Sequence, residues 1–74
     1  MPDRTADAIG LLCPLPVLRA RKVLEDMTSG EVLTLLASDA MAQVDVPAFC
    51  REAGHEFLGM TEVEGGQAYS IRKA

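Results

Sequence analysis

The sequence predicts a two-layer α/β sandwich in which two helices cover one face of a mixed four-stranded sheet. The first observation behind this prediction is the spacing of apolar residues, which is typical of strands in some segments and of helices in others. Along the chain these segments follow the order strand, helix, strand, helix, strand, strand (βαβαββ). The second is the Gly65-Gly66 pair between the last two segments, a strong hairpin signal because both turn positions can take a positive φ. A chain of 74 residues has room for one modest core, so we expect residues 1–74 to form a single domain, with residues 1–4 frayed.

The first half of the chain supplies a strand, a helix and a second strand. Thr5–Ile9 is a short strand candidate that ends at Gly10. Glu31–Ser38 carries apolar residues on both alternating faces, which is typical of a central strand. Between them, residues from Pro14 onward are expected to be helical until Ser29-Gly30, because apolar side chains recur at helical spacing. The apolar face of this helix consists of Val17, Ala20, Val23, Leu24 and Met27.

The second helix is expected after a connector at Asp39–Val44. Asp45 is the predicted cap of this helix, Pro47 falls in its first turn, and Gly54 ends it. Its apolar stripe follows the spacing i, i+3, i+4, i+7 and consists of Val46, Phe49, Cys50 and Ala53.

Glu56–Glu64 and Gln67–Lys73 complete the sheet as an antiparallel pair. Each strand–helix–strand unit should return to a parallel strand through a right-handed connection. In such a layout the carboxyl ends of the first two strands and the amino ends of both helices share one edge. Cys13, Asp39 and Asp45 are expected to lie at this edge.

Composition narrows the functional classes. With 49% hydrophobic residues, 24% charged residues and a net charge of −4, the chain is of the folded globular class, and its acidity argues against direct nucleic-acid binding. The apolar run Ile9–Leu18 is shorter than the roughly 20 residues that span a bilayer, so no membrane contact is expected. Asp3 and Asp7 stand where a secretory signal would be basic, so we expect a cytoplasmic protein without a structural disulfide between its two cysteines.

The segment GLLCPLPVLRARK places a thiol at the start of a helix. Pro14 and Pro16 remove only N–H groups that would have no partner within the helix, so they give it a rigid beginning at almost no cost. We expect the remaining N–H groups, such as those of Leu15 and Val17, to lie near the Cys13 sulfur and to lower the pKa of this thiol. The alternative is that Cys13 is simply a small buried residue at a helix start.

The stretch DAIGLLCPLPVLRARK resembles the signature of the TusA/SirA-like family of small sulfur-carrier proteins, Asp-x-x-Gly-x-x-Cys-Pro-x-Pro followed by an apolar and basic helix. The similarity continues through Asp39 and the closing Ile71-Arg72-Lys73, and covers about residues 6–73. It implies a sandwich similar to the C-terminal domain of translation initiation factor 3, with sheet order 1-2-4-3. The signature positions are matched by Asp7, Gly10, Cys13, Pro14 and Pro16.

The resemblance implies covalent sulfur carriage without a metal or organic cofactor. Cys13 would attack the persulfide of a donor such as a cysteine desulfurase or a rhodanese-like protein, hold the sulfane sulfur, and pass it to an acceptor sulfurtransferase. Such relays feed tRNA thiolation, molybdenum-cofactor assembly or sulfur oxidation. Two other classes stay open: a thiol redox protein, which CPLP in place of CxxC disfavours, and a non-catalytic binding or regulatory module.

Three further residues have a structural and a functional interpretation. Cys50 is expected to pack in the core, with a resolving or regulatory thiol as the alternative. A single His55 and two distant cysteines give no zinc-site spacing. Asp7 either hydrogen-bonds near the Cys13 turn or transfers a proton, and its charge, like that of Asp39, would oppose thiolate formation.

The first helix also carries a basic cluster close to the thiol. Arg19, Arg21 and Lys22 are predicted to form a docking patch for acidic donor and acceptor proteins, with Leu18 as its apolar centre and Asp39 at the same edge. The alternative is a solvated helix face. A carrier must release its partners, so we expect small, transient contacts and a monomer.

Overall fold

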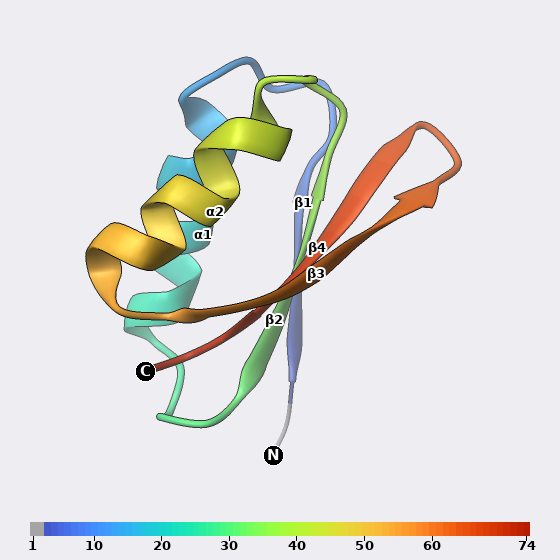
Figure 1. The fold of residues 1–74 in the computed structure, drawn as a ribbon. Coiled ribbons are helices and arrows are strands. Elements are labelled where there is room, and N and C mark those ends of the chain that lie inside the picture. The colour runs from blue at the N-terminus through green and yellow to red at the C-terminus, as the bar shows by residue number, and fades with distance from the viewer. Residues whose placement is uncertain (1–2) are drawn as a thin grey trace.

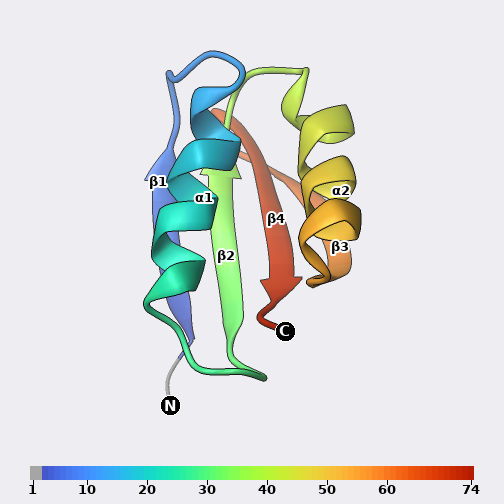
Figure 2. The same ribbon diagram turned by 90° about the vertical axis from the view of Figure 1, so that its left-hand side faces the viewer.

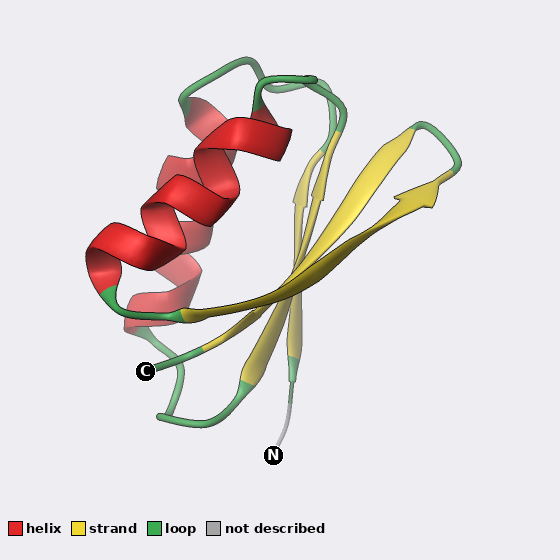
Figure 3. Cartoon of the chain, in the orientation of Figure 1, coloured by secondary structure: helices red, strands yellow, loops and turns green. Residues whose placement is uncertain are grey.

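The structure is a computed structural model that describes residues 3–74. Two helices lie together on one side of a twisted sheet (Figures 1 and 3), which confirms the predicted two-layer α/β sandwich. In chain order the elements are β1 (Arg4–Ala8), α1 (Leu15–Glu25), β2 (Val32–Ala37), α2 (Ala42–Ala53), β3 (Glu56–Val63) and β4 (Gly66–Arg72). Neither of these helices is long and apolar enough to cross a membrane.

The sheet has the order β1-β2-β4-β3, as the family resemblance implied. β1 runs parallel to β2, whereas β4 is antiparallel to both of its neighbours, β2 and β3. Figure 2 shows α1 in front of β1 and β2, and α2 beside β4. β2 is a central strand, as predicted: its face towards the helices is buried, and its other face is half-buried.

The core lies between the sheet and the helices. Ala20, Leu24 and Met27 of the first predicted apolar face are buried, and Val17 and Val23 pack against them. Complete burial of a leucine such as Leu24 stabilises the fold by roughly 1.5–3 kcal/mol. From the sheet, the core receives alternate residues of three strands: Ala6, Ala8, Leu33, Leu35, Ala37, Tyr69 and Ile71.

The second helix begins earlier than predicted, at Ala42 instead of after Asp45. Asp39 organises this start: its carboxylate Oδ1 accepts the Met41 N–H at 3.0 Å, and its carbonyl accepts the Ala42 N–H at 3.0 Å. Asp45 is therefore an acidic residue in the first turn rather than the cap.

Two residues of this helix also differ from their predicted positions. Pro47 lies inside α2, where it removes one internal hydrogen bond. Val46, Phe49 and Cys50 are buried as predicted, whereas Ala53 in the last turn is exposed. Ala42 takes the remaining core position, because the earlier start extends the apolar stripe towards the amino end.

The hairpin between the last two strands was predicted at the wrong pair of residues. Val63 pairs with Gly66, so the turn is Glu64-Gly65, and Gly65 alone has a positive φ, of 87°. Gly66 belongs to β4, and a Cβ at this position would collide with the carbonyl oxygen of Ala37. Gly66 is thus required by a close approach of two backbones and not by the turn.

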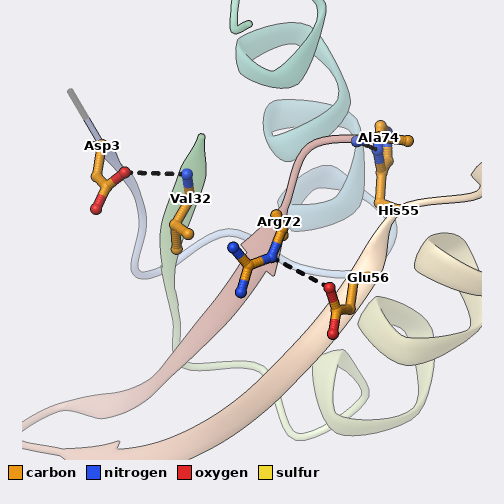
Figure 4. A network of polar contacts seen from close by, with 6 residues as sticks. All are labelled: Asp3, Val32, His55, Glu56, Arg72 and Ala74. Carbon is orange, nitrogen blue, oxygen red and sulfur yellow. Dashed lines mark hydrogen bonds and ion pairs between the residues drawn. The ribbon is translucent and has the colours of Figure 1, made fainter. Parts of the chain in front are cut away.

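At the amino end, Met1 and Pro2 of the expected frayed segment lie outside the described residues. Arg4 already belongs to β1, and the carboxylate Oδ1 of Asp3 accepts the N–H of Val32 at 3.1 Å (Figure 4). This contact fixes the amino end of β1 beside the amino end of β2.

Candidate functional site

The loop between β1 and α1 presents Cys13 at the edge of the sheet. Asp7 Oδ1 accepts the Ile9 N–H at 2.9 Å, and Gly10 donates its N–H to Ser38 Oγ at 2.8 Å. Gly10 has a φ of 86°, a conformation that residues with a side chain rarely adopt. Asp7 and Gly10 of the signature therefore shape the loop, and the geometry of the Asp7 carboxylate is that of a turn contact.

The start of α1 is arranged differently from the prediction. The helix begins at Leu15, directly after Pro14, and Pro16 is buried in its first turn. The N–H of Leu15 donates to the Leu12 carbonyl at 2.8 Å, so it does not donate to the Cys13 sulfur.

Cys13 is exposed and makes two polar contacts that connect α1 with the start of the second helix. Its N–H donates to Asp39 Oδ2 at 2.7 Å. Its Sγ donates to Asp45 Oδ2, also at 2.7 Å. Cys13 thus lies within hydrogen-bond distance of both carboxylates, Asp39 and Asp45, that the topology placed at its edge. Hydrogen bonds from the backbone N–H groups of Cys13 and Met41 hold the pKa of Asp39 below its ordinary value.

The pKa of Cys13 is raised above its ordinary value, opposite to the expectation from the helix start. The hydrogen bond to Asp45 is the largest cause, followed by desolvation and by the charges of Asp45 and Asp39. A carboxylate that accepts a hydrogen bond from the S–H stabilises the neutral thiol and would repel a thiolate. Cys13 therefore rests as a thiol in the free chain.

A groove of about 290 Å³ between α1 and α2 opens beside Cys13. One part of its lining is apolar and another is charged, so it could receive a peptide segment or a side chain that carries a reactive sulfur. Its main lining residues besides Cys13 are Pro14, Val17, Phe49, Arg21, Asp45 and Glu52.

The predicted docking residues divide into two groups. Arg21 lines the groove beside Cys13. Leu18, Arg19 and Lys22 line a separate hollow of about 270 Å³ together with Leu11 and Leu15. Arg19 also donates from Nη1 to the Asp7 carbonyl at 3.0 Å, which connects α1 to the end of β1.

Large apolar side chains are exposed on the segments that flank the thiol. Leu12 is 71% exposed, immediately before Cys13, and Val44 is 62% exposed, immediately before Asp45. Such residues are candidates for contact with another protein. We call this set the apolar rim; it consists of Ile9, Leu12, Leu15, Leu18, Met41 and Val44.

The second cysteine lies away from solvent. Cys50 is completely buried in α2, and burial raises its pKa to about 11. Both cysteines are free. The prediction that Cys50 belongs to the core is confirmed.

His55 lies at the opposite end of the helices from Cys13. Its Nδ1 accepts the N–H of Ala74 at 3.0 Å (Figure 4), and its ring lies 5.7 Å from that of Phe49. Desolvation, followed by the charge of Lys73, lowers the pKa of His55. Within residues 3–74, no cluster of three or more His, Cys, Asp or Glu side chains could hold a metal ion.

Asp45 is the site residue whose role the sequence did not reveal. Its position before an apolar helical stripe favours a cap, and the residue pattern gives no sign of contact with the sulfur. The only signal available in the sequence was the topology, which placed it at the same edge as Cys13.

The fold and site define a small two-layer α/β protein that presents one exposed thiol on the turn before a helix. The family model described as sulfurtransferase TusA matches residues 4–73, and the chain belongs to this family of sulfur carriers.

Similar proteins agree with this membership. A protein of Neisseria meningitidis serogroup A, named as a candidate sulfur carrier, is 51% identical over 65 residues, which cover 88% of each chain. The sulfur carrier protein TusA of Pseudomonas entomophila is 44% identical over 71 residues, covering 96% of this chain and 89% of the other. The crystal structure of a SirA-like protein from Desulfitobacterium hafniense superimposes with a TM-score of 0.79 at 28% identity and covers 96% of both chains.

Proposed function

We propose that this protein carries sulfane sulfur as a persulfide on Cys13, between a donor protein and an acceptor protein. The observation that carries the proposal is the contrast between its two cysteines. Cys13 is exposed at the mouth of a groove, whereas Cys50 is buried with a pKa of about 11. Since the thiolate is the nucleophile, only Cys13 is available for exchange with another protein.

In the proposed loading step, Cys13 first loses its thiol proton. The thiolate then attacks the outer sulfur of a persulfide on the donor. A bond forms between Cys13 Sγ and this sulfur, the S–S bond of the donor breaks, and the donor cysteine leaves as a thiolate that takes up a proton. Unloading is the same exchange, with a thiolate of the acceptor as the nucleophile. Neither step requires an oxidant, a reductant, a metal or an organic cofactor.

The surface around Cys13 supports docking of partner proteins. The apolar rim can supply a small contact area, and Arg21 places a positive charge in the groove beside the thiol. We infer that the donor is a cysteine desulfurase or a rhodanese-like protein and that the acceptor is another sulfurtransferase. Transfer would take place in the cytoplasm, by a monomer that acts as one domain, in a relay for tRNA thiolation, molybdenum-cofactor assembly or sulfur oxidation.

The experiment is intact mass spectrometry after incubation with a cysteine desulfurase and cysteine. Addition of one sulfur atom, located on Cys13 by peptide mapping, is the expected result. A disulfide between Cys13 and Cys50 would instead indicate a redox protein. An unchanged mass, with a donor that loads an established carrier in parallel, would favour the non-catalytic binding module.

A further inference from the structure

The contact between Cys13 and Asp45 is the one polar interaction of the reactive sulfur within residues 3–74. The distance from Sγ to Oδ2 is 2.7 Å, and the two residues come from the opposite sides of the groove, one before α1 and one in α2. Asp45 occupies the first turn of α2, where the helix dipole favours a negative charge. The geometry therefore places a carboxylate against the thiol that has to ionise before it can react.

The other charged groups around the sulfur do not offset this carboxylate. Asp39 binds the Cys13 N–H from the loop after β2, and Glu52 lines the groove from α2. Arg21 is the cation that lines the groove from α1, but its guanidinium lies over the Phe49 ring. The ion pair found among the described residues joins Arg72 to Glu56, so Arg21 is not paired with Asp45.

We propose that Asp45 holds Cys13 as a hydrogen-bonded thiol in the free carrier, and that this contact opens when a donor protein docks in the groove. This inference rests on the proposed function and adds to it a selectivity for protein donors over small diffusible reagents. The free carrier would react slowly with diffusible electrophiles, oxidants and small sulfur compounds. It would react readily with a protein donor, because that donor brings groups into the groove that separate the carboxylate from the sulfur or neutralise it.

The first test compares Asp45→Asn with wild type and with Glu52→Gln in their reaction with iodoacetamide. Glu52→Gln is the matched control, because it removes a carboxylate of the same groove and helix that does not contact the sulfur. In Asp45→Asn, the inflection of the rate against pH should move to lower pH. For each unit by which the pKa of Cys13 falls, the thiolate fraction at pH 7 rises about tenfold and the nucleophilicity of the thiolate falls about threefold. The alkylation rate at pH 7 should therefore rise about threefold for each unit. Glu52→Gln should lie close to wild type.

The proposal is overturned if the inflection of Asp45→Asn coincides with that of wild type, or if Glu52→Gln moves it equally. A second measurement uses the wild-type protein and does not depend on the folding of a variant. The NMR signal of the Asp45 carboxyl carbon should show a step at the inflection pH of Cys13, and this step should vanish in Cys13→Ser. A carboxyl signal that does not respond to Cys13 ionisation contradicts the contact.

The second test compares two sulfur donors, inorganic polysulfide and a cysteine desulfurase in its persulfide form. Asp45→Asn should accelerate loading from polysulfide about as much as it accelerates alkylation, and should change loading from the desulfurase much less. Equal acceleration with both donors would show that docking does not open the contact. Absence of loading in wild type with either donor would refute the proposed function, whereas the alkylation profiles would still decide the role of Asp45.

Discussion

Arg21 lies over the ring of Phe49, with its guanidinium carbon 5.8 Å from the ring centroid, and both residues line two hollows of the surface. One hollow is the groove beside Cys13, and the other, of about 350 Å³, extends to His55 and Lys73. A cation held against an aromatic face loses less side-chain entropy on binding than a free one, so Arg21 is prepared to meet an approaching protein.

Arg21→Glu should slow sulfur transfer from a protein persulfide, because the reversed charge repels an acidic partner next to the thiol. The effect is read from the rate of sulfur loading in the mass assay. Iodoacetamide, a small uncharged reagent, should react with the variant within a few-fold of the wild-type rate. Increasing salt should slow wild-type transfer, since the Debye length is about 10 Å at 0.1 M.

Lys22→Glu is the matched control for this charge reversal. Lys22 is on the same helix but lines the separate hollow with Leu18 and Arg19. If both reversals slow transfer equally, the whole basic face contributes through its net charge. If neither reversal nor salt changes the rate, Arg21 belongs to a solvated helix surface and the docking contact lies on the apolar rim.

Cys13→Ser should abolish sulfur loading and leave the fold intact, because an alcohol cannot form a persulfide. Serine keeps the backbone N–H that donates to Asp39, and its hydroxyl can still donate to Asp45. Intact mass and thermal unfolding measure the two properties separately. Sulfur uptake by this variant would exclude Cys13 as the carrier.

Cys50→Ala should still load sulfur but lose stability by roughly 1–2 kcal/mol, since the substitution leaves a small cavity in the core. Urea denaturation gives the free energy of unfolding, and the mass assay gives loading at a temperature where the variant is folded. A loading defect in the folded variant would assign Cys50 a chemical role that its burial does not predict.

The stability of the fold should fall as the pH decreases below about 6.5, the ordinary pKa of histidine. The pKa of His55 is lowered in the folded chain, so the unfolded chain binds a proton more readily in this range. The contribution of His55 to the free energy of unfolding is complete above the pKa that this residue has in the unfolded chain. It is lost as the pH falls through the pKa of His55 in the folded chain. His55→Gln should flatten the dependence of the unfolding free energy on pH in the interval just below about pH 6.5.

The lowered pKa of Asp39 changes the free energy of unfolding only in more acidic solution. It therefore does not mask the change in stability that His55 produces. Identical slopes for wild type and His55→Gln across the interval would show that His55 does not contribute.

Gly66→Ala should destabilise the fold by roughly 1–3 kcal/mol, because the new Cβ meets the carbonyl oxygen of Ala37 and one of the two strands has to move. Glu64→Ala, in the exposed turn of the same hairpin, should stay within about 0.5 kcal/mol of wild type. Both are measured by urea denaturation. A neutral Gly66→Ala would mean that β2 and β4 adjust at this point without loss.

Much of the fold could be predicted from the sequence, because the responsible signals are local. The period of apolar residues distinguishes the strand Val32–Ala37 from the helix Leu15–Glu25, and the apolar residues on both faces of this strand indicate its central place. The parallel and antiparallel connections follow from segment order. The order of strands came from the family resemblance, and the structure confirms it.

The sequence by itself determined that Cys13 stands at a helix start and, through the order of the segments, that Asp39 and Asp45 share its edge. Only the tertiary structure decided the chemistry at this edge. The start of α2 depends on the Asp39 contacts, and the place of Gly66 depends on the approach of β2. The pKa of Cys13 depends on a carboxylate 2.7 Å from the sulfur, which reverses the effect expected from the helix start. The physical reason is that electrostatic and steric interactions act through space over a few ångströms, and the sequence pattern does not specify such distances between residues far apart in the chain.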